Sequence, residues 1–86
     1  MKIYKYPLKN VLTTQELDLP RSARVLTFGM QNGKPVIWAT VDETPIKEKR
    51  TFVIAPTGGG IPDWNTHYVG TAFDGPFVWH LFELKA

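Results

Sequence analysis

Two residues, Asn32 and Gly33, separate a pair of alternating apolar runs and predict a β-hairpin. A two-residue hairpin loop of type I′ needs a positive φ at both central positions, and Asn and Gly adopt that conformation at the lowest cost. We therefore pair residues 25–31 with residues 34–41 as antiparallel strands. The second arm contains the motif PVIWATV, which is apolar on both faces and is typical of a central strand.

The rest of the chain repeats this pattern of short strands and turns. Seven Gly and seven Pro divide it into short apolar segments. Further strands are expected in the motifs KIYKYPL, TTQELDLP, RTFVIA, THYVGTAF and FVWHLFEL. Pro7 lacks a backbone donor, so KIYKYPL is expected at a sheet edge or as a strand end. Asp74-Gly75-Pro76 predicts a second hairpin.

The segments between these strands are expected to be irregular. DETPIKEKR is polar and turn-forming, and PTGGGIPDW is a Gly-rich loop in which residues 62–64 suit one short helical turn. We predict a single, mainly β domain over residues 1–86 with little helix. It should contain about seven short strands in a small antiparallel sheet, curled into a barrel or a sandwich.

The composition favours a soluble protein. With 43% hydrophobic and 21% charged residues, the 86-residue chain suits one folded domain. It has no cysteine, which excludes disulfides and thiolate metal sites and suits a reducing cytosol. Because we find neither a signal peptide nor an apolar run near the ~20 residues of a membrane span, we expect a cytoplasmic location and no membrane partner. The net charge of +2 gives little support for binding duplex DNA.

No catalytic constellation is apparent in the sequence. His67 and His80 have no Asp, Glu or His at the spacing of a metal site. A nucleophile would have to come from Ser22 or from threonines in undistinguished surroundings. The carboxylates, Glu83 among them, are mostly attributed to turns. We therefore expect a non-enzymatic protein without a metal or another cofactor.

His80 admits two interpretations. Strand alternation in FVWHLFEL places it on a face with apolar neighbours. In the first interpretation the imidazole is structural, and Tyr68 or Thr71 on the preceding strand pairs with it, because a buried ring nitrogen needs a partner. In the second, this face is the wall of a ligand pocket or of a subunit interface.

Two polar segments also admit two interpretations each. Glycine amides in TGGG (residues 57–60) are suited to an anion-binding nest, yet the segment lacks the P-loop and GxGxxG patterns and is equally consistent with a flexible connection. The basic cluster in PIKEKR is either a solvated rim or a binding patch. The aromatic content of 13% exceeds what one small sheet with a solvated face covers, so we expect a homo-oligomer.

Several motifs follow one another in a specific order: IYKYPL (3–8), LPRSARVLTFGMQNGKPVIWATVD (19–42), KRTFVI (49–54), TG before IP (57–62), YVGT (68–71) and VWHLFE (78–83). Together they resemble a family of short proteins of tailed bacteriophages and prophages, over nearly the whole chain. The loop of that family usually reads more like TGHPIP, so a loop histidine has no counterpart in TGGGIP. The resemblance implies a phage-encoded accessory protein in the host bacterial cytosol and implies no particular activity.

Small phage proteins of this kind commonly bind a host protein or sequester a nucleotide signal. Our leading hypothesis is a non-enzymatic homo-oligomer that sequesters a nucleotide-type signalling molecule of bacterial anti-phage defence. Basic side chains would contact phosphate, the loop amides would form a nest, and tryptophans would stack on a base. The candidate ligand-binding residues are Trp38, Lys49, Arg50, Thr57, Gly58, Gly59, Gly60 and Trp64. The alternatives are a protein-protein inhibitor or adaptor that acts through an aromatic sheet face, and a binder of single-stranded nucleic acid.

Overall fold

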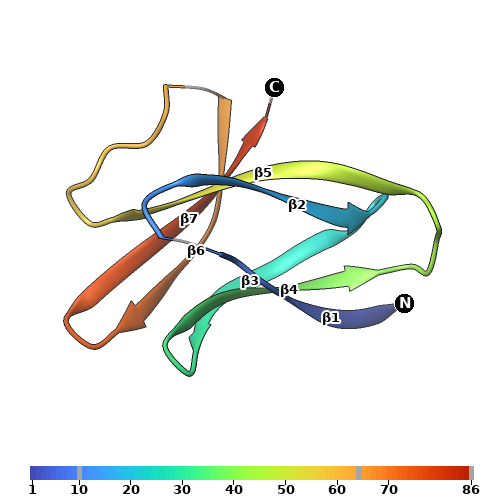
Figure 1. Cartoon of the computed structure of the whole chain (residues 1–86), viewed down its shortest axis with the longest axis horizontal. Helices are drawn as coiled ribbons and strands as arrows, with labels where there is room; N and C mark the ends of the chain where they lie inside the picture. Colours follow the sequence, from blue (N-terminus) through green and yellow to red (C-terminus); the bar gives the residue numbers. More distant parts are fainter. Residues whose placement is uncertain (10, 64, 86) are drawn as a thin grey trace.

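The computed structural model describes residues 1–9, 11–63 and 65–85. These residues form antiparallel strands in the order β1 (Lys2–Pro7), β2 (Thr14–Pro20), β3 (Arg24–Gln31), β4 (Lys34–Val41), β5 (Lys47–Pro56), β6 (Asn65–Asp74) and β7 (Phe77–Lys85). One sheet has the order β1-β4-β3 and the other has the order β2-β5-β7-β6 (Figure 1). The prediction of a mainly β fold with seven strands is confirmed. Of the two predicted forms, the described residues adopt the two-layered sandwich and do not close into a barrel.

The β3–β4 hairpin turns at the residues that predicted it. Asn32 has a φ of 53° and Gly33 a φ of 75°, and Gln31 lies opposite Lys34 across the two-residue loop. Both central positions therefore have the positive φ that a type I′ turn requires. As predicted, β4 is the central strand of its sheet and β1 lies at the edge.

The polar segment before β5 is more ordered than its composition predicts. β5 begins at Lys47 rather than at Arg50, so the turn expected over residues 42–50 is shorter. Asp18 and Pro20 of β2 lie opposite Lys49 and Lys47. Pairing with a neighbouring strand thus extends β5 beyond its apolar part, because tertiary context outweighs local strand propensity.

The described residues contain no helix. The short helical turn expected at residues 62–64 is not formed by Pro62 and Asp63, and Trp64 lies outside the described residues. In the part of the chain that the structure describes, no helix is long and apolar enough to cross a membrane.

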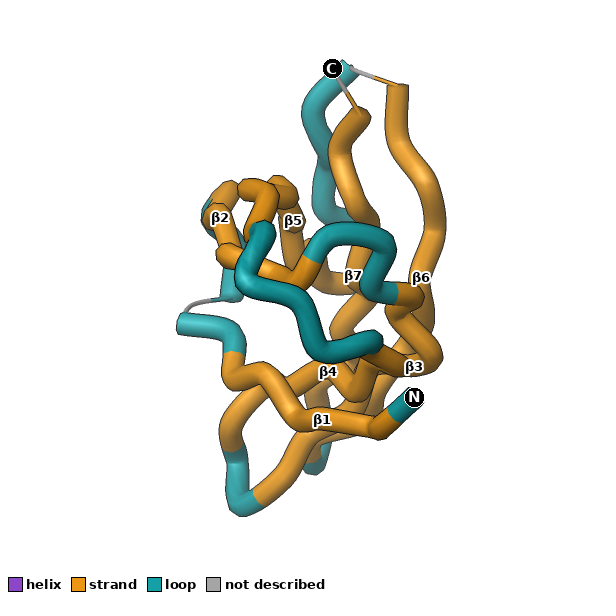
Figure 2. Tube along the Cα trace, turned by 90° about the vertical axis from the view of Figure 1, so that its right-hand side faces the viewer, coloured by secondary structure: helices purple, strands orange, loops and turns teal. Residues whose placement is uncertain are grey.

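The hydrophobic core lies between the two sheets, which Figure 2 shows as separate layers. Alternate residues of each strand point inward, as the period of a β-strand requires. The largest fully buried side chains are Phe52, Leu19, Ile37, Ile54, Leu81 and Val41. Full burial of such a side chain contributes roughly 1.5–3 kcal/mol, so this layer of contacts holds the sheets together.

The two sheets meet along one side, where β3 lies against β6 (Figure 2). Each of these strands contains an irregularity in its pairing, between Val25 and Thr27 in β3 and between Tyr68 and Gly70 in β6. A Cβ added to Gly70 would lie 3.5 Å from the Cβ of Phe28, so the strands approach closely there. Bulges bend strands and redirect side chains. Here they border a cleft between the layers.

Candidate functional site

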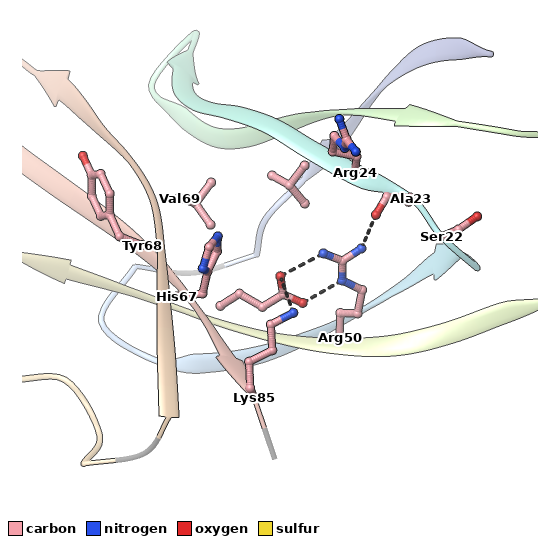
Figure 3. A pocket seen from close by; sticks show the side chains of 10 residues that line it. Ser22, Ala23, Arg24, Arg50, His67, Tyr68, Val69 and Lys85 are labelled. Carbon is pink, nitrogen blue, oxygen red and sulfur yellow. Dashed lines mark hydrogen bonds and ion pairs between the residues drawn. The ribbon is translucent and has the colours of Figure 1, made fainter.

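A cleft with several basic side chains opens at this end of the sandwich (Figure 3). It has a volume of about 390 Å³ and lies between the start of β3, β5, the start of β6 and the end of β7. We call it the basic cleft. The side chains with a charge or an imidazole that line it are Arg24, Arg50, His67, Glu83 and Lys85.

An ion pair between Arg50 and Glu83 lies at the centre of the basic cleft. Strand alternation directs both side chains toward the inner layer, and His67 lies opposite Glu83 on β6. Arg50 Nε lies 2.6 Å from Glu83 Oε2 and Arg50 Nη2 lies 2.8 Å from Oε1, while Nη1 donates to the carbonyl oxygen of Ala23 at 2.5 Å. The side chains are only 15% and 5% exposed. This bidentate pair therefore joins β5 and β7 to the segment before β3.

The pair fixes the charges of both groups. Burial by itself raises the pKa of Glu83, but the hydrogen bonds and charge of Arg50, together with Lys85, outweigh it and hold that pKa below its ordinary value. The hydrogen bonds from Arg50 to Glu83 likewise raise the pKa of the guanidinium. Lys85 Nζ lies 3.6 Å from Glu83 Oε1 and its side chain is 50% exposed. The basic cleft therefore holds more positive than negative charge.

Lys49 borders the same region. A neighbouring hollow of about 470 Å³ is lined by Lys49, Arg50, Glu83 and Lys85, so the two basic residues that the sequence proposed for phosphate do lie near each other. Lys49 Nζ is 3.2 Å from Asp18 Oδ1, and both side chains are largely exposed. An exposed pair of this kind contributes little to stability and is easily exchanged for another anion.

The Gly-rich loop lies at the other end of β5. At about 3.3 Å per residue, Thr57 is roughly 23 Å from Arg50 along the strand, so the two do not share a pocket within one chain. Gly59 N donates to the carbonyl oxygen of Pro56, and Thr57 N donates to that of Val78. Two of the amides proposed for an anion nest are thus already used within the protein.

A tight turn explains Gly58 in this loop. The hydrogen bond from Gly59 N to Pro56 O closes a four-residue turn in which Gly58 has a φ of +86°. A positive φ at the third position is the mark of a type II turn, which favours glycine there. Gly60 has open space around it. The loop lines a hollow of about 250 Å³ together with His80 and Phe82.

His80 has a partner on each side of its ring. Its Nε2 lies 2.7 Å from the hydroxyl of Thr57 and its Nδ1 lies 3.0 Å from that of Thr71, which in turn lies 2.6 Å from the Tyr68 hydroxyl. The pairing with Thr71 that the structural interpretation expected is confirmed. The Thr57 hydroxyl beside the His80 imidazole has the geometry of a nucleophile and its general base. In a catalytic triad a carboxylate orients the base, whereas here the neutral Thr71 hydroxyl contacts the other ring nitrogen. We therefore interpret this chain of hydrogen bonds as a tie between the loop and the sheet.

Trp38, one of the tryptophans proposed for stacking, does not line the basic cleft. Trp38 is on β4, in the three-stranded sheet, and its ring covers Gly29, where an added Cβ would lie 3.1 Å from Trp38 Cζ3. Trp64 lies outside the described residues. Within the described residues, the proposed ligand-binding residues thus fall into three separate places.

One comparison with known proteins finds a match. A family model described as a domain of unknown function (DUF7352) matches residues 1–86. The chain belongs to this family. No curated protein and no solved structure matches it significantly.

Of the charged and imidazole side chains in the basic cleft of this DUF7352 protein, sequence reasoning proposed Arg50 and missed Arg24, His67, Glu83 and Lys85. Glu83 was grouped with carboxylates at turns, but it lies within β7 and is 4% exposed. Alternation places it on the inner face with Trp79 and Leu81, and a carboxylate among such residues requires a cationic partner. That signal was present in FVWHLFELK.

The DUF7352 protein offers no grouping of residues for metal binding among those that the structure describes. No three His, Asp or Glu side chains there come together as a metal site would need. Ser22, the serine considered as a nucleophile, has its hydroxyl beside the carbonyl oxygen of Arg21. What the basic cleft is chemically suited to do is to bind an anion.

Proposed function

We propose that this DUF7352 protein is a non-enzymatic binding protein that sequesters a nucleotide-type signalling molecule, with the phosphate groups of the ligand at the basic cleft. The observation that supports this proposal is the Arg50 guanidinium, which Glu83 and Ala23 hold in one orientation. Its remaining N–H bonds have no acceptor among the described residues, and Lys85 lies beside it. A fixed fork of donors next to a second cation is well suited to phosphate.

A base has a surface to contact in the same cleft. The His67 imidazole is exposed and lies opposite Glu83 in the strand pairing. Imidazole rings stack on nucleobases, as the rings of Phe, Tyr and Trp do. Together these side chains offer the phosphate and the base of one ligand separate contacts.

The sequence indicates the kind of organism and compartment in which we propose that the protein acts. The order of motifs from IYKYPL to VWHLFE resembles short proteins of tailed bacteriophages. On that resemblance we propose that the protein is phage-encoded, that it acts in the host bacterial cytosol as a homo-oligomer, and that its ligand is a signal of anti-phage defence.

The test is thermal unfolding of the purified protein with a panel of cyclic di- and trinucleotides and ADP-ribose derivatives. A ligand at a hundred times its dissociation constant stabilises the folded state by about 2.7 kcal/mol, which is a shift of several degrees for a domain of this size. Lys85→Gln should remove most of that shift. Lys47→Gln changes another exposed lysine, which precedes Arg50 in the sequence. This variant should leave the thermal shift intact.

The choice of Lys85 rather than Arg50 matters for this test. Arg50→Ala also breaks the ion pair with Glu83, so lost binding and lost stability would coincide. If no ligand of the panel shifts the transition, or if Lys85→Gln and Lys47→Gln bind alike, the proposal fails. An affinity for oligonucleotides that falls steeply with salt would instead favour the single-strand binder.

A second candidate function is an inhibitor or adaptor that binds a protein through an aromatic face. Phe73 is 74% exposed and Tyr68 is 54% exposed, both on β6. Large exposed aromatic side chains favour a protein contact. Phe73→Ser should abolish such an activity and should leave nucleotide binding unchanged, which separates the two candidates.

A further inference from the structure

Each sheet ends in a strand that has a neighbour on one side only. β1 is an edge of the three-stranded sheet and β2 is an edge of the four-stranded sheet. The strands at the other ends of the two orders, β3 and β6, lie against each other. We call β1 and β2 the open edges. Unpaired N–H and C=O groups along such a strand form a template for a further strand.

A hydrogen bond at the end of the β1–β4 ladder shows which backbone groups of β1 point outward. Leu8 N donates to the carbonyl oxygen of Pro35, in the same register as the β1–β4 pairs. Since hydrogen-bonded pairs alternate along an antiparallel ladder, the even-numbered residues of β1 bond to β4. The N–H and C=O groups of Ile3 and Lys5 therefore point away from the sheet. Both residues are exposed.

The same reasoning applies to β2. Arg21 N donates to the carbonyl oxygen of Ile46, in register with the β2–β5 pairs, so the odd-numbered residues bond to β5. The N–H and C=O groups of Thr14, Glu16 and Asp18 point outward. All three residues are exposed. Both open edges thus present donors and acceptors that no strand of the same chain uses.

The open edges carry opposite charges. Residues 2–7 contain two lysines and no acidic residue, whereas residues 14–20 contain two acidic residues and no basic one. Lys5 donates to the neutral side chain of Gln31. Within the described residues, neither Lys5 nor Glu16 forms an ion pair. Each open edge therefore keeps one charge that its own chain does not compensate.

We propose that β1 of one copy pairs antiparallel with β2 of a second copy, with Lys5 opposite Glu16. This register pairs the whole of β1 and places Ile3 opposite Asp18. The outward-pointing N–H and C=O groups of the two strands then face each other. Residues directly opposite one another point to the same face of a sheet, so Lys5 and Glu16 form a cross-strand ion pair.

The contact forms twice in a two-fold dimer. Figure 1 shows β1 and β2 running in opposite directions along the molecule. A two-fold rotation about an axis along the strands keeps these directions, so each β1 lies antiparallel to the β2 of the other copy. The three-stranded sheet of each copy thereby extends the four-stranded sheet of the other. Tyr4, which is 42% exposed in the single chain, then lies opposite Leu17.

This pairing gives an interface to the homo-oligomer proposed above, and it rests on that part of the proposed function. None of the paired residues lines the basic cleft, so association and nucleotide binding can fail separately. The interface is also distinct from a contact through the exposed rings of Phe73 and Phe77.

The test is disulfide formation between two variants, since the chain has no cysteine of its own. Opposite residues of a hydrogen-bonded pair have Cα atoms about 5.5 Å apart, which a disulfide spans. A mixture of Ile3→Cys and Asp18→Cys should therefore form a mixed disulfide in a thiol redox buffer, detected by mass spectrometry. A mixture of Ile3→Cys and Thr14→Cys should not, because Thr14 lies about 13 Å further along the same strand.

A charge exchange supplies the second measurement. Lys5→Glu sets two carboxylates opposite each other and Glu16→Lys sets two lysines opposite each other. Each change should weaken association at least about threefold in sedimentation equilibrium. A chain with both changes has opposite charges again and should regain the association of wild type. All these positions are exposed, so the variants should keep the fold.

The outcomes separate this interface from the other proposals. Equal cross-linking of the two mixtures, or a doubly changed chain that associates as weakly as the single variants, overturns the pairing. A monomeric wild-type protein overturns both the pairing and the homo-oligomer, whereas the nucleotide panel tests the basic cleft independently. Adding Phe73→Ser to both cysteine variants should leave the mixed disulfide intact. Its loss would assign the association to the hairpin rings instead.

Discussion

At the scale of single residues, the pairing of Arg50 with Glu83 has the largest expected effect on stability. Glu83→Gln leaves a nearly buried guanidinium without its counter-charge, and breaking a buried pair costs about 3 kcal/mol. We expect that loss in urea denaturation at pH 7. Glu16→Gln, at an exposed position of β2, is the matched control and should change stability by less than about 0.5 kcal/mol. Equal stability of the two variants would contradict the role of the pair.

The same pair predicts a dependence of stability on pH. The pKa of folded Glu83 lies below its ordinary value of 4.5, so between the two values the unfolded state binds more protons than the folded state. The stabilisation is therefore complete above pH 4.5 and is lost as the pH falls through the folded pKa. Denaturation from pH 7 to pH 3 should show the difference between wild type and Glu83→Gln shrink. A constant difference over this range would show that Glu83 is not held in the charged form.

Substitutions of the two histidines should have different effects, one on stability and the other on ligand binding. His80→Ala removes the hydrogen bonds to the hydroxyls of Thr57 and Thr71 and should lower the free energy of unfolding by roughly 0.5–1.5 kcal/mol. His67→Ala removes an exposed ring and should instead weaken ligand binding at the basic cleft with little change in stability. Urea denaturation and ligand-induced thermal shifts measure both properties. A His80→Ala variant that unfolds like wild type but fails to bind ligand would assign His80 to a site.

At the scale of elements, the turn after β5 distinguishes two neighbouring glycines. A Cβ at Gly59 would lie 2.8 Å from Pro56 Cδ and 3.1 Å from the Pro56 carbonyl oxygen, whereas a Cβ at Gly60 meets nothing within 4 Å. Gly59→Ala should therefore cost roughly 1–3 kcal/mol by overpacking. Gly60→Ala should be neutral or slightly stabilising. Similar unfolding midpoints for both variants would mean that the turn is not needed.

Most of the fold prediction rested on turn residues and on the pattern of apolar residues along each strand. Asn32-Gly33 predicted the β3–β4 hairpin because few residues adopt its backbone conformation, and PVIWATV predicted a central strand because both of its faces are apolar. The polar start of β5 could not be found in this way, since pairing with β2 orders Lys47–Pro56 as one strand. The irregularities in β3 and β6 leave no local signal either, because they depend on how the two sheets meet.

The candidate sites were less predictable than the strands for the same reason. The basic cleft is assembled from segments far apart in the sequence, so its members share no motif. Lys49 and Arg50 were found because they are neighbours in the chain, and Lys85 was not because only the sheet brings it there. Sequence alone also could not reveal that Arg50 is the cationic partner that Glu83 requires.

At the scale of the whole molecule, the exposed aromatic residues of the β6–β7 hairpin predict self-association. Phe73 is 74% exposed and Phe77 is 54% exposed. Burying such rings against another copy removes apolar surface from water. Light scattering should give a mass above that of one chain, and Phe73→Ser should lower it. A monomeric wild-type protein would contradict this prediction, whereas a Lys47→Gln control should keep the wild-type mass.

The strand order also has a consequence for synthesis. β1 and β2 each pair with a strand that follows much later, with Pro7 opposite Val36 and Thr14 opposite Val53. At about 5–20 residues per second, β1 waits roughly 2–7 s after its own synthesis until β4 is made. Leu19 of β2, which is fully buried in the finished fold, gains its strand partner only when Glu48 of β5 is made. The growing chain is therefore the form most open to chaperones and to aggregation, and slower translation lengthens its exposure.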